Sequence, residues 1–135
     1  MKTILYLVLS VLIFASCKNQ NSTPEDEHDH AQDEVSLKFA EYNTQYELFA
    51  EVQPMVAGHT GGILVHLTKL SDFSPLTEGT VTASLIIGTK GIRQKLEKPT
   101  RPGIYLFELQ PEVAGKGKLI FDIKTANGES SIVVN

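Results

Sequence analysis

The sequence has one cysteine and no tryptophan, and aromatic side chains make up only 7% of its 135 residues. A single cysteine has no partner in the same chain, so a fold held together by internal disulfides is excluded. Basic residues are also scarce, with 12 lysines and arginines against 16 aspartates and glutamates. Because no basic stripe is present to neutralise phosphates, the composition argues against nucleic acid as a partner.

Catalytic motifs are missing as well. The chain contains no Gly-x-Ser-x-Gly turn, no glycine-rich phosphate loop leading into a helix and no His-Glu-x-x-His segment. The acids of the C-terminal hundred residues mostly alternate with basic neighbours, which is typical of a solvated strand face. We therefore predict that the protein is not an enzyme, and no small-molecule substrate is apparent. The length and 41% hydrophobic content suit one small domain with an N-terminal extension.

The only long apolar run lies at the N-terminus, in MKTILYLVLSVLIFAS. A lysine near the start, an apolar stretch from Ile4 to Ala15 and small residues after it have the three-part pattern of a secretory signal. The stretch is too short to span a bilayer comfortably as a permanent helix. We predict a signal peptide at residues 1–16 and leave it out of the fold.

The residues at the end of this segment, FASC, resemble the lipobox of bacterial lipoproteins. That resemblance implies cleavage before Cys17 and acylation of its sulfur, which also accounts for the unpaired cysteine. Several acyl chains on one residue would anchor the protein stably to membrane lipid. The alternative is an ordinary signal peptide that leaves Cys17 as a free thiol.

An acidic segment follows Cys17. Up to Glu34 it holds one lysine and six acidic residues, whereas the rest of the chain from Val35 is close to neutral. Such a split predicts a disordered, lipidated tether at residues 17–41 and a folded domain at residues 42–135.

Two histidines lie in this tether among the carboxylates. His28 and His30, with Asp29 and Glu27, offer imidazole and carboxylate ligands suited to zinc, copper or cobalt. Binding would have to order a flexible segment, so the expected site is weak and promiscuous. A hydrophilic spacer without metal is the alternative, and the two roles are compatible.

A second, weaker candidate metal site consists of Met55, His59 and His66. The two histidines are seven positions apart, so on one regular strand they point to opposite faces. A bulge at Gly61 and Gly62 would reset that parity and allow a copper site. Otherwise His66 is a strand residue and His59 a loop residue.

The rest of the chain alternates apolar and polar residues with the period of two that is typical of strands. In KGKLIFDIKT, for example, Leu119, Phe121 and Ile123 share one face. We predict an all-β, immunoglobulin-like antiparallel sandwich of about seven strands. The segments IRQKLEK and GIYLFELQ flank the turn PTRPG, and we interpret them as a hairpin.

Residues 46–125 also resemble a known family. The strand YELFAEVQP, the segments HLTKL and SDFSPLTEGTVTASL, and the later RPGIY and AGKGKLIFDIKT carry the likeness. They are similar to the N-terminal domain of periplasmic adaptor (membrane fusion) subunits of heavy-metal RND efflux pumps, in the lipoprotein form. The resemblance implies a Gram-negative cell envelope, a protein facing the periplasm, and RND pump components as partners. It covers one domain of those adaptors.

Three functional hypotheses remain open from the sequence. The chain is part of an efflux adaptor that captures or relays metal cations, a stand-alone lipoprotein that binds metal as a chaperone, or a structural module that docks a partner protein through a strand edge.

Overall fold

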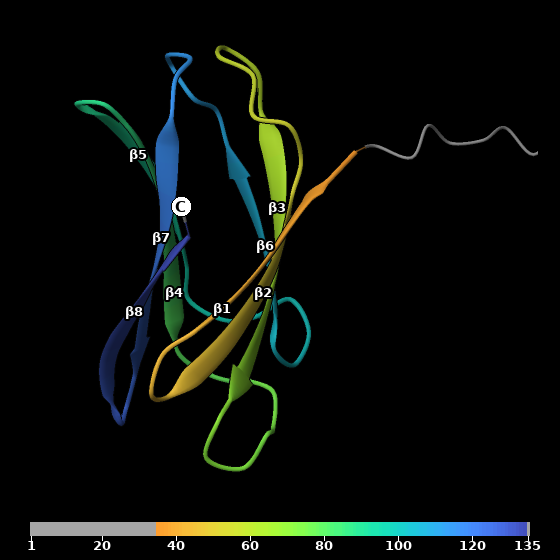
Figure 1. Ribbon diagram of the computed structural model, residues 1–135. Coiled ribbons are helices and arrows are strands. Elements are labelled where there is room, and N and C mark those ends of the chain that lie inside the picture. Colours follow the sequence, from red (N-terminus) through yellow and green to blue (C-terminus); the bar gives the residue numbers. More distant parts are fainter. Residues whose placement is uncertain (1–34, 135) are drawn as a thin grey trace, which may run out of the picture. The chain divides into compact units, whose positions relative to one another are not determined.

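Eight β-strands make up residues 35–134, the part of the chain that the computed structural model describes (Figure 1). No helix occurs in that part. The strands are β1 Leu37–Tyr42, β2 Tyr46–Val52, β3 Gly61–Lys69, β4 Thr80–Ile87, β5 Lys90–Leu96, β6 Ile104–Leu109, β7 Gly117–Thr125 and β8 Gly128–Val134.

The strands form two antiparallel sheets of four strands each. The first sheet has the order β1-β2-β3-β6, and the second has the order β5-β4-β7-β8. The chain changes sheet after β3, after β5 and again after β6, while the other connections join hydrogen-bonded neighbours. The two sheets pack face to face around one apolar core, which confirms the predicted immunoglobulin-like sandwich.

Alternation along the strands determines which side chains enter the core. Strand β2 buries every second residue, and β3 does the same from Gly61 to Leu67. On β7 the predicted inward residues Leu119, Phe121 and Ile123 are all buried, and Phe121 is 0% exposed. No polar or charged residue is buried among residues 35–134. The inner faces are therefore wholly apolar, as the period of two predicts.

Aromatic rings connect the two sheets near the middle of the core. The ring centroids of Phe107 on β6 and Phe121 on β7 lie 6.1 Å apart at a tilt of 58°. Tyr105, two residues before Phe107, stacks on it at 6.3 Å. These rings bury large apolar areas in a geometry that favours aromatic pairs.

The predicted hairpin across PTRPG is wrong. Strand β5 pairs with β4 through the two-residue turn Gly88–Thr89, and β6 pairs with β3 in the other sheet. The PTRPG segment does contain a local turn, in which the Ile104 amide donates to the Arg101 carbonyl at 2.8 Å. Because its two prolines cannot donate to a ladder, the segment carries the chain between sheets.

The domain also begins earlier than predicted. Strand β1 lies at Leu37–Tyr42, inside the range that the sequence assigned to the tether, and adds an eighth strand to the expected seven. Phe39 is the one residue of β1 that is not exposed, so the segment has little of the alternation that marks a strand. It is a strand because β2 provides a complete antiparallel ladder.

Side-chain amides link the two sheets at both open edges. The Asn43 amide nitrogen donates to the Ser130 hydroxyl at 2.7 Å and to the Ser131 carbonyl at 3.1 Å, which joins the β1–β2 turn to β8. At the other edge the Gln94 side-chain oxygen accepts from the Glu108 amide at 2.7 Å, joining β5 to β6. Both amides satisfy backbone groups that edge strands leave unpaired.

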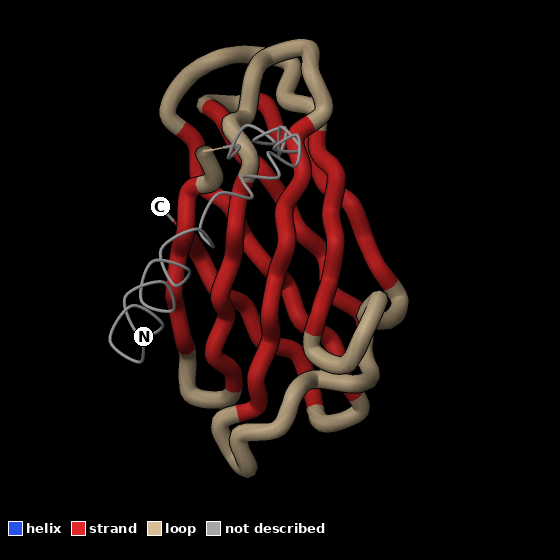
Figure 2. Tube along the Cα trace, turned by 90° about the vertical axis from the view of Figure 1, so that its right-hand side faces the viewer, coloured by secondary structure: helices blue, strands red, loops and turns tan. Residues whose placement is uncertain are grey.

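The connections gather at the two ends of the sandwich (Figures 1 and 2). We call one end the tether end, because the chain enters the domain there; it comprises residues 35–37 and the loops at residues 53–60, 88–89 and 110–116. The opposite far end comprises the loops at residues 43–45, 70–79, 97–103 and 126–127.

Candidate functional site

The predicted anchor and the first predicted metal site lie outside the described residues. This applies to Cys17 and to the ligand set Glu27, His28, Asp29 and His30. They remain predictions from the sequence.

The structure places the three residues of the second predicted metal site in three different surroundings. His59 lies exposed in the loop at residues 53–60. Met55 is half-buried against the core, with its sulfur 2.7 Å from the point where a Cβ on Gly61 would lie. His66 lies on the outer face of β3, where its ring meets Phe49 edge-on with centroids 5.9 Å apart.

The distances along β3 keep these side chains apart. Gly61, beside the Met55 sulfur, and His66 are five residues apart on one strand, which corresponds to about 16 Å. The register from Gly61 to His66 is continuous, so no bulge brings the two histidines to one face. Within residues 35–134 there is no group of three histidine, cysteine, aspartate or glutamate side chains that could hold a metal ion. The structure therefore does not assemble the site from Met55, His59 and His66.

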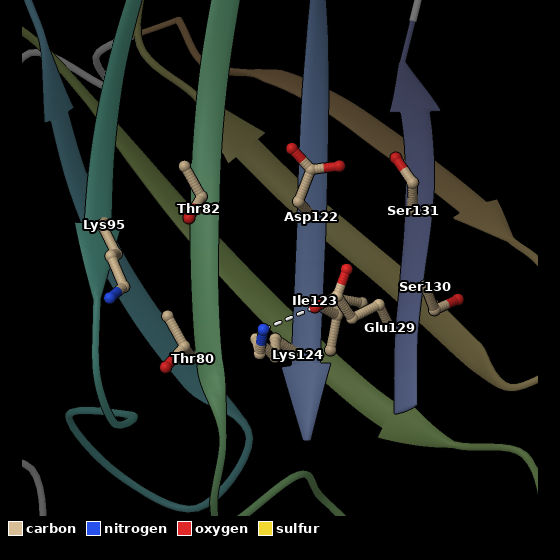
Figure 3. Close-up of a pocket in the computed structure, with 9 residues that line it drawn as sticks. All are labelled: Thr80, Thr82, Lys95, Asp122, Ile123, Lys124, Glu129, Ser130 and Ser131. Atoms are coloured by element: carbon tan, nitrogen blue, oxygen red, sulfur yellow. Dashed lines mark hydrogen bonds and ion pairs between the residues drawn. The ribbon is translucent and has the colours of Figure 1, made fainter. Parts of the chain in front are cut away.

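A polar hollow of about 400 Å³ lies on the outer face of the second sheet (Figure 3). Strand register puts Lys95, Thr82, Asp122 and Ser131 in one row across four strands. Its residues are Thr80, Thr82, Lys95, Asp122, Ile123, Lys124, Glu129, Ser130 and Ser131. Hydroxyl, ammonium and carboxylate groups alternate here, so the hollow is a solvated strand face.

Ion pairs set the charge state of this face. Lys124 donates to Glu129, and this hydrogen bond and the opposite charges lower the pKa of Glu129 and raise the pKa of Lys124. Hydrogen bonds, first from Lys95 and then from Thr80, lower the pKa of the neighbouring Glu97. These shifts move the pKa values of the three groups further from pH 7, whereas general acid–base catalysis favours a pKa near the working pH.

The outer face of the first sheet differs in chemistry. Register aligns Ala40, Phe49, His66 and Ile104 across its four strands. In the next row Leu64 and Leu106 lie beside Glu51 on β2 and Lys38 on β1, and Leu106 is 51% exposed. Outer faces of antiparallel sheets are usually polar, so the apolar residues that gather here on β2, β3 and β6 are a candidate protein-contact surface.

Sequence reasoning missed one more feature, an apolar hollow of about 270 Å³ at the tether end. It opens between the two sheets and is lined by Leu37, Phe39, Met55, Ile87 and Val113, among others. The signal that could have pointed to it is an apolar side chain in each of two loops, Met55 and Val113.

Comparison with known proteins identified no relative: no family model, no curated protein and no solved structure matches the chain. Residues 35–134 also contain no helix of the length and hydropathy needed to cross a membrane.

Proposed function

We propose that this protein is the lipid-anchored, non-catalytic periplasmic domain of a heavy-metal efflux adaptor, whose tether captures metal cations and passes them toward an RND pump. One observation carries the proposal: His28, Asp29 and His30 lie between a lipobox cysteine and a domain whose sequence resembles such adaptors over residues 46–125. The tether would capture the cation, and the sandwich would hold it near the pump.

The chemistry of the described domain supports a binding role. Its titratable side chains lie at the surface, apart from the core tyrosines Tyr46 and Tyr105, and the polar hollow on the outer face of the second sheet is a row of solvated strand residues. Burial raises the pKa of Tyr105 to about 12, so this hydroxyl stays protonated at neutral pH. Tyr105 therefore packs and donates a hydrogen bond rather than exchanging protons.

Metal capture by the tether can be measured by calorimetric titration of residues 18–135 with zinc, copper and cobalt. We expect weak heats that disappear in the double variant His28→Ala and His30→Ala. The matched control is the double variant His59→Ala and His66→Ala, which should keep the wild-type heats. Equal heats in both double variants, or none in the wild type, would contradict metal capture by the tether.

Lipid anchoring has its own test. Cys17→Ser should move the protein from the membrane fraction to the soluble periplasmic fraction, because the acylated sulfur is lost. Continued membrane association of this variant would rule out anchoring through Cys17. A pump partnership requires further that deleting the gene raises metal sensitivity only in cells that contain the RND pump. Sensitivity in cells without the pump would favour a stand-alone metal-binding lipoprotein.

A second candidate function is a protein-interaction module, and the apolar outer face of the first sheet favours it. Leu106→Ser removes an apolar side chain of that face that is 51% exposed, and Val133→Ser, on the outer face of the second sheet, is its control. If the pump docks on the first sheet, only Leu106→Ser should weaken co-purification of the pump. Equal co-purification with both variants would show that the pump does not dock on this face.

A further inference from the structure

Exposed apolar side chains concentrate at the tether end. Four of the eight large apolar residues with high exposure in the described chain lie there, namely Val35 at 76%, Leu37 at 54%, Val56 at 53% and Val113 at 37%. They come from the N-terminal entry and from two separate loops, which the fold brings to one end of the sandwich. Scattered exposed apolar residues are normal, but a group of them at one end indicates a contact surface.

The apolar hollow described above lies among these side chains. Besides Leu37 and Val113 it is lined by Phe39, Met55 and Val134, which face the gap between the two sheets. The surface is therefore continuous with the core, without a polar layer between them.

Hydrogen bonds hold the two valine-bearing loops together. The Gly58 amide donates to the Pro111 carbonyl at 2.8 Å, and the Gln110 amide nitrogen donates to the Gly58 carbonyl at 2.8 Å. An ion pair at 3.3 Å between Lys90 and Glu112 joins the loop at residues 110–116 to β5. A surface that is ordered before contact loses little entropy on binding, so a modest apolar area can suffice.

Lysines flank this surface. Lys116 and Lys118 follow Val113 closely in the chain, are both exposed, and form no ion pair with an acid among residues 35–134. Long lysine side chains next to apolar residues suit the boundary between headgroups and acyl chains, where the stem contacts lipid and the ammonium stays in water.

We propose that the tether end is a membrane-docking surface, with Val56 and Val113 entering the headgroup region of the bilayer and Lys116 and Lys118 contacting lipid phosphates. This inference rests on the proposed anchor at Cys17. Seventeen residues, 18–34, separate Cys17 from Val35, a reach of at most about 60 Å, so an anchor at Cys17 limits how far the domain can move from the bilayer, and the chain enters the domain at the tether end. The lysines offset part of the repulsion between the acidic tether and anionic lipid.

The test uses Cys17, the only cysteine of the chain, as a chemical handle. Residues 17–135 contain the whole folded unit at residues 34–135, and the Cys17 thiol can be coupled to a maleimide lipid in vesicles of phosphatidylethanolamine and phosphatidylglycerol. Hydrogen exchange measured by mass spectrometry then compares coupled and free protein. We expect exchange to slow several-fold in the loops at residues 53–60 and 110–116 and to stay unchanged at residues 70–79.

Matched variants define the contact. The double variant Val56→Ser and Val113→Ser should abolish the protection, whereas Tyr42→Ser with Phe73→Ser, at the far end, should leave it intact. Lys116→Glu with Lys118→Glu should reduce it more than Lys98→Glu with Arg101→Glu. All eight residues lie outside the buried core, so thermal melts should show that these proteins remain folded.

Two outcomes would overturn the proposal. One is equal exchange in coupled and free protein, which would mean that the domain does not touch the bilayer. The other is protection that appears in free protein at high concentration and is lost in the valine variant, which would make the surface a contact between copies of this chain. Because the coupling is chemical, neither result depends on whether the cell acylates Cys17, and the fractionation of Cys17→Ser tests the anchor separately.

Discussion

The two ends of the sandwich are built differently. At the far end Leu76 is 3% exposed and closes the gap between the sheets, although it lies in a loop. At the tether end the corresponding gap is an apolar hollow of about 270 Å³ with the half-buried Met55 at its side. One end is closed by a core residue, and the other leaves core residues accessible.

Backbone hydrogen bonds account for the closed end. The Leu76 amide donates to the Leu67 carbonyl at 2.9 Å, the Leu67 amide to the Gly103 carbonyl at 2.8 Å, and the Gly103 amide to the Leu76 carbonyl at 2.8 Å. These three bonds join the loops at residues 70–79 and 97–103 to β3. Since buried backbone groups need partners, this ring of bonds is what allows a loop leucine to enter the core.

The contrast indicates that the two ends have different roles. The far end adds stability, because it buries apolar area and satisfies its own backbone. The tether end keeps apolar area exposed, and in our proposal the bilayer covers that area. Four experiments test this comparison, in order of expected effect.

Phe121→Ala provides the reference that belongs to neither end. Phe121 is fully buried in mid-sandwich and contacts Phe107 across the sheets, so its loss should lower the free energy of unfolding by about 3–5 kcal/mol. Chemical denaturation measures this. A loss under about 1 kcal/mol would mean that Phe121 is not a core residue.

Leu76→Ala and Met55→Ala compare the two ends directly. Leu76→Ala should lower the free energy of unfolding by about 3 kcal/mol, because it leaves a cavity under a closed loop. Met55→Ala should cost about 1 kcal/mol, since this side chain is already partly in water. Urea denaturation measures both losses. Equal losses in the two variants would show that both ends contribute equally to stability, against the proposed difference between them.

Gly103→Ala and Gly58→Ala separate backbone strain from crowding. Both glycines have positive φ, 75° and 80°, so a new methyl group strains each to a similar extent, by about 1 kcal/mol. At Gly103 a Cβ would also lie 2.8 Å from the Pro75 Cβ and 3.0 Å from the Leu67 carbonyl oxygen, whereas nothing lies within 4 Å at Gly58. Thermal unfolding should therefore show about 1–2 kcal/mol more destabilisation at the far end. Similar losses of stability in the two variants would show that crowding around Gly103 adds nothing to the backbone strain.

Tyr105 gives the far end a pH dependence. Burial, and to a lesser extent the charge of Tyr46, raise the pKa of Tyr105 to about 12 from the usual 10.0. The unfolded chain therefore loses this proton first, and stability should fall as the pH rises from about 10 toward 12. Between pH 9 and 11 the fall attributable to Tyr105 is about 1.4 kcal/mol.

Tyr105→Phe removes the titrating group and should flatten that fall, although it also deletes the 3.4 Å hydrogen bond to the Gly79 carbonyl. The control Tyr42→Phe changes an exposed tyrosine and should leave the fall as it is. Denaturation curves at several alkaline pH values measure both. If the free energy of unfolding of Tyr105→Phe falls as much with pH as that of the wild type, groups other than Tyr105 cause the fall.

The sequence predicted a large part of the fold. Alternation identified the inward faces of β2, β3, β4 and β7, because side chains of a strand alternate between its two faces wherever it pairs. It did not identify β1, since edge residues are exposed on both sides and alternate weakly. The predicted pairing of β5 with β6 was also wrong. The turn residues of PTRPG are typical of a hairpin whether or not the flanking strands share a sheet.

The candidate sites could be predicted only in part. His59 and His66 were read correctly as a loop residue and a strand residue, but whether they meet Met55 depended on the register of β3. The tether end could not be predicted as a surface. Leu37, Met55 and Val113 come from three separate segments, and only their packing shows that they line one hollow.

By itself the sequence determined the class of fold and the residues that face the core, because both follow from a period of two along each strand. Only the tertiary structure decided the sheet partners, the burial of the loop residue Leu76 and the exposure of Val56 and Val113 at one end. Those features depend on contacts between segments far apart in the chain, which no local pattern of residues encodes.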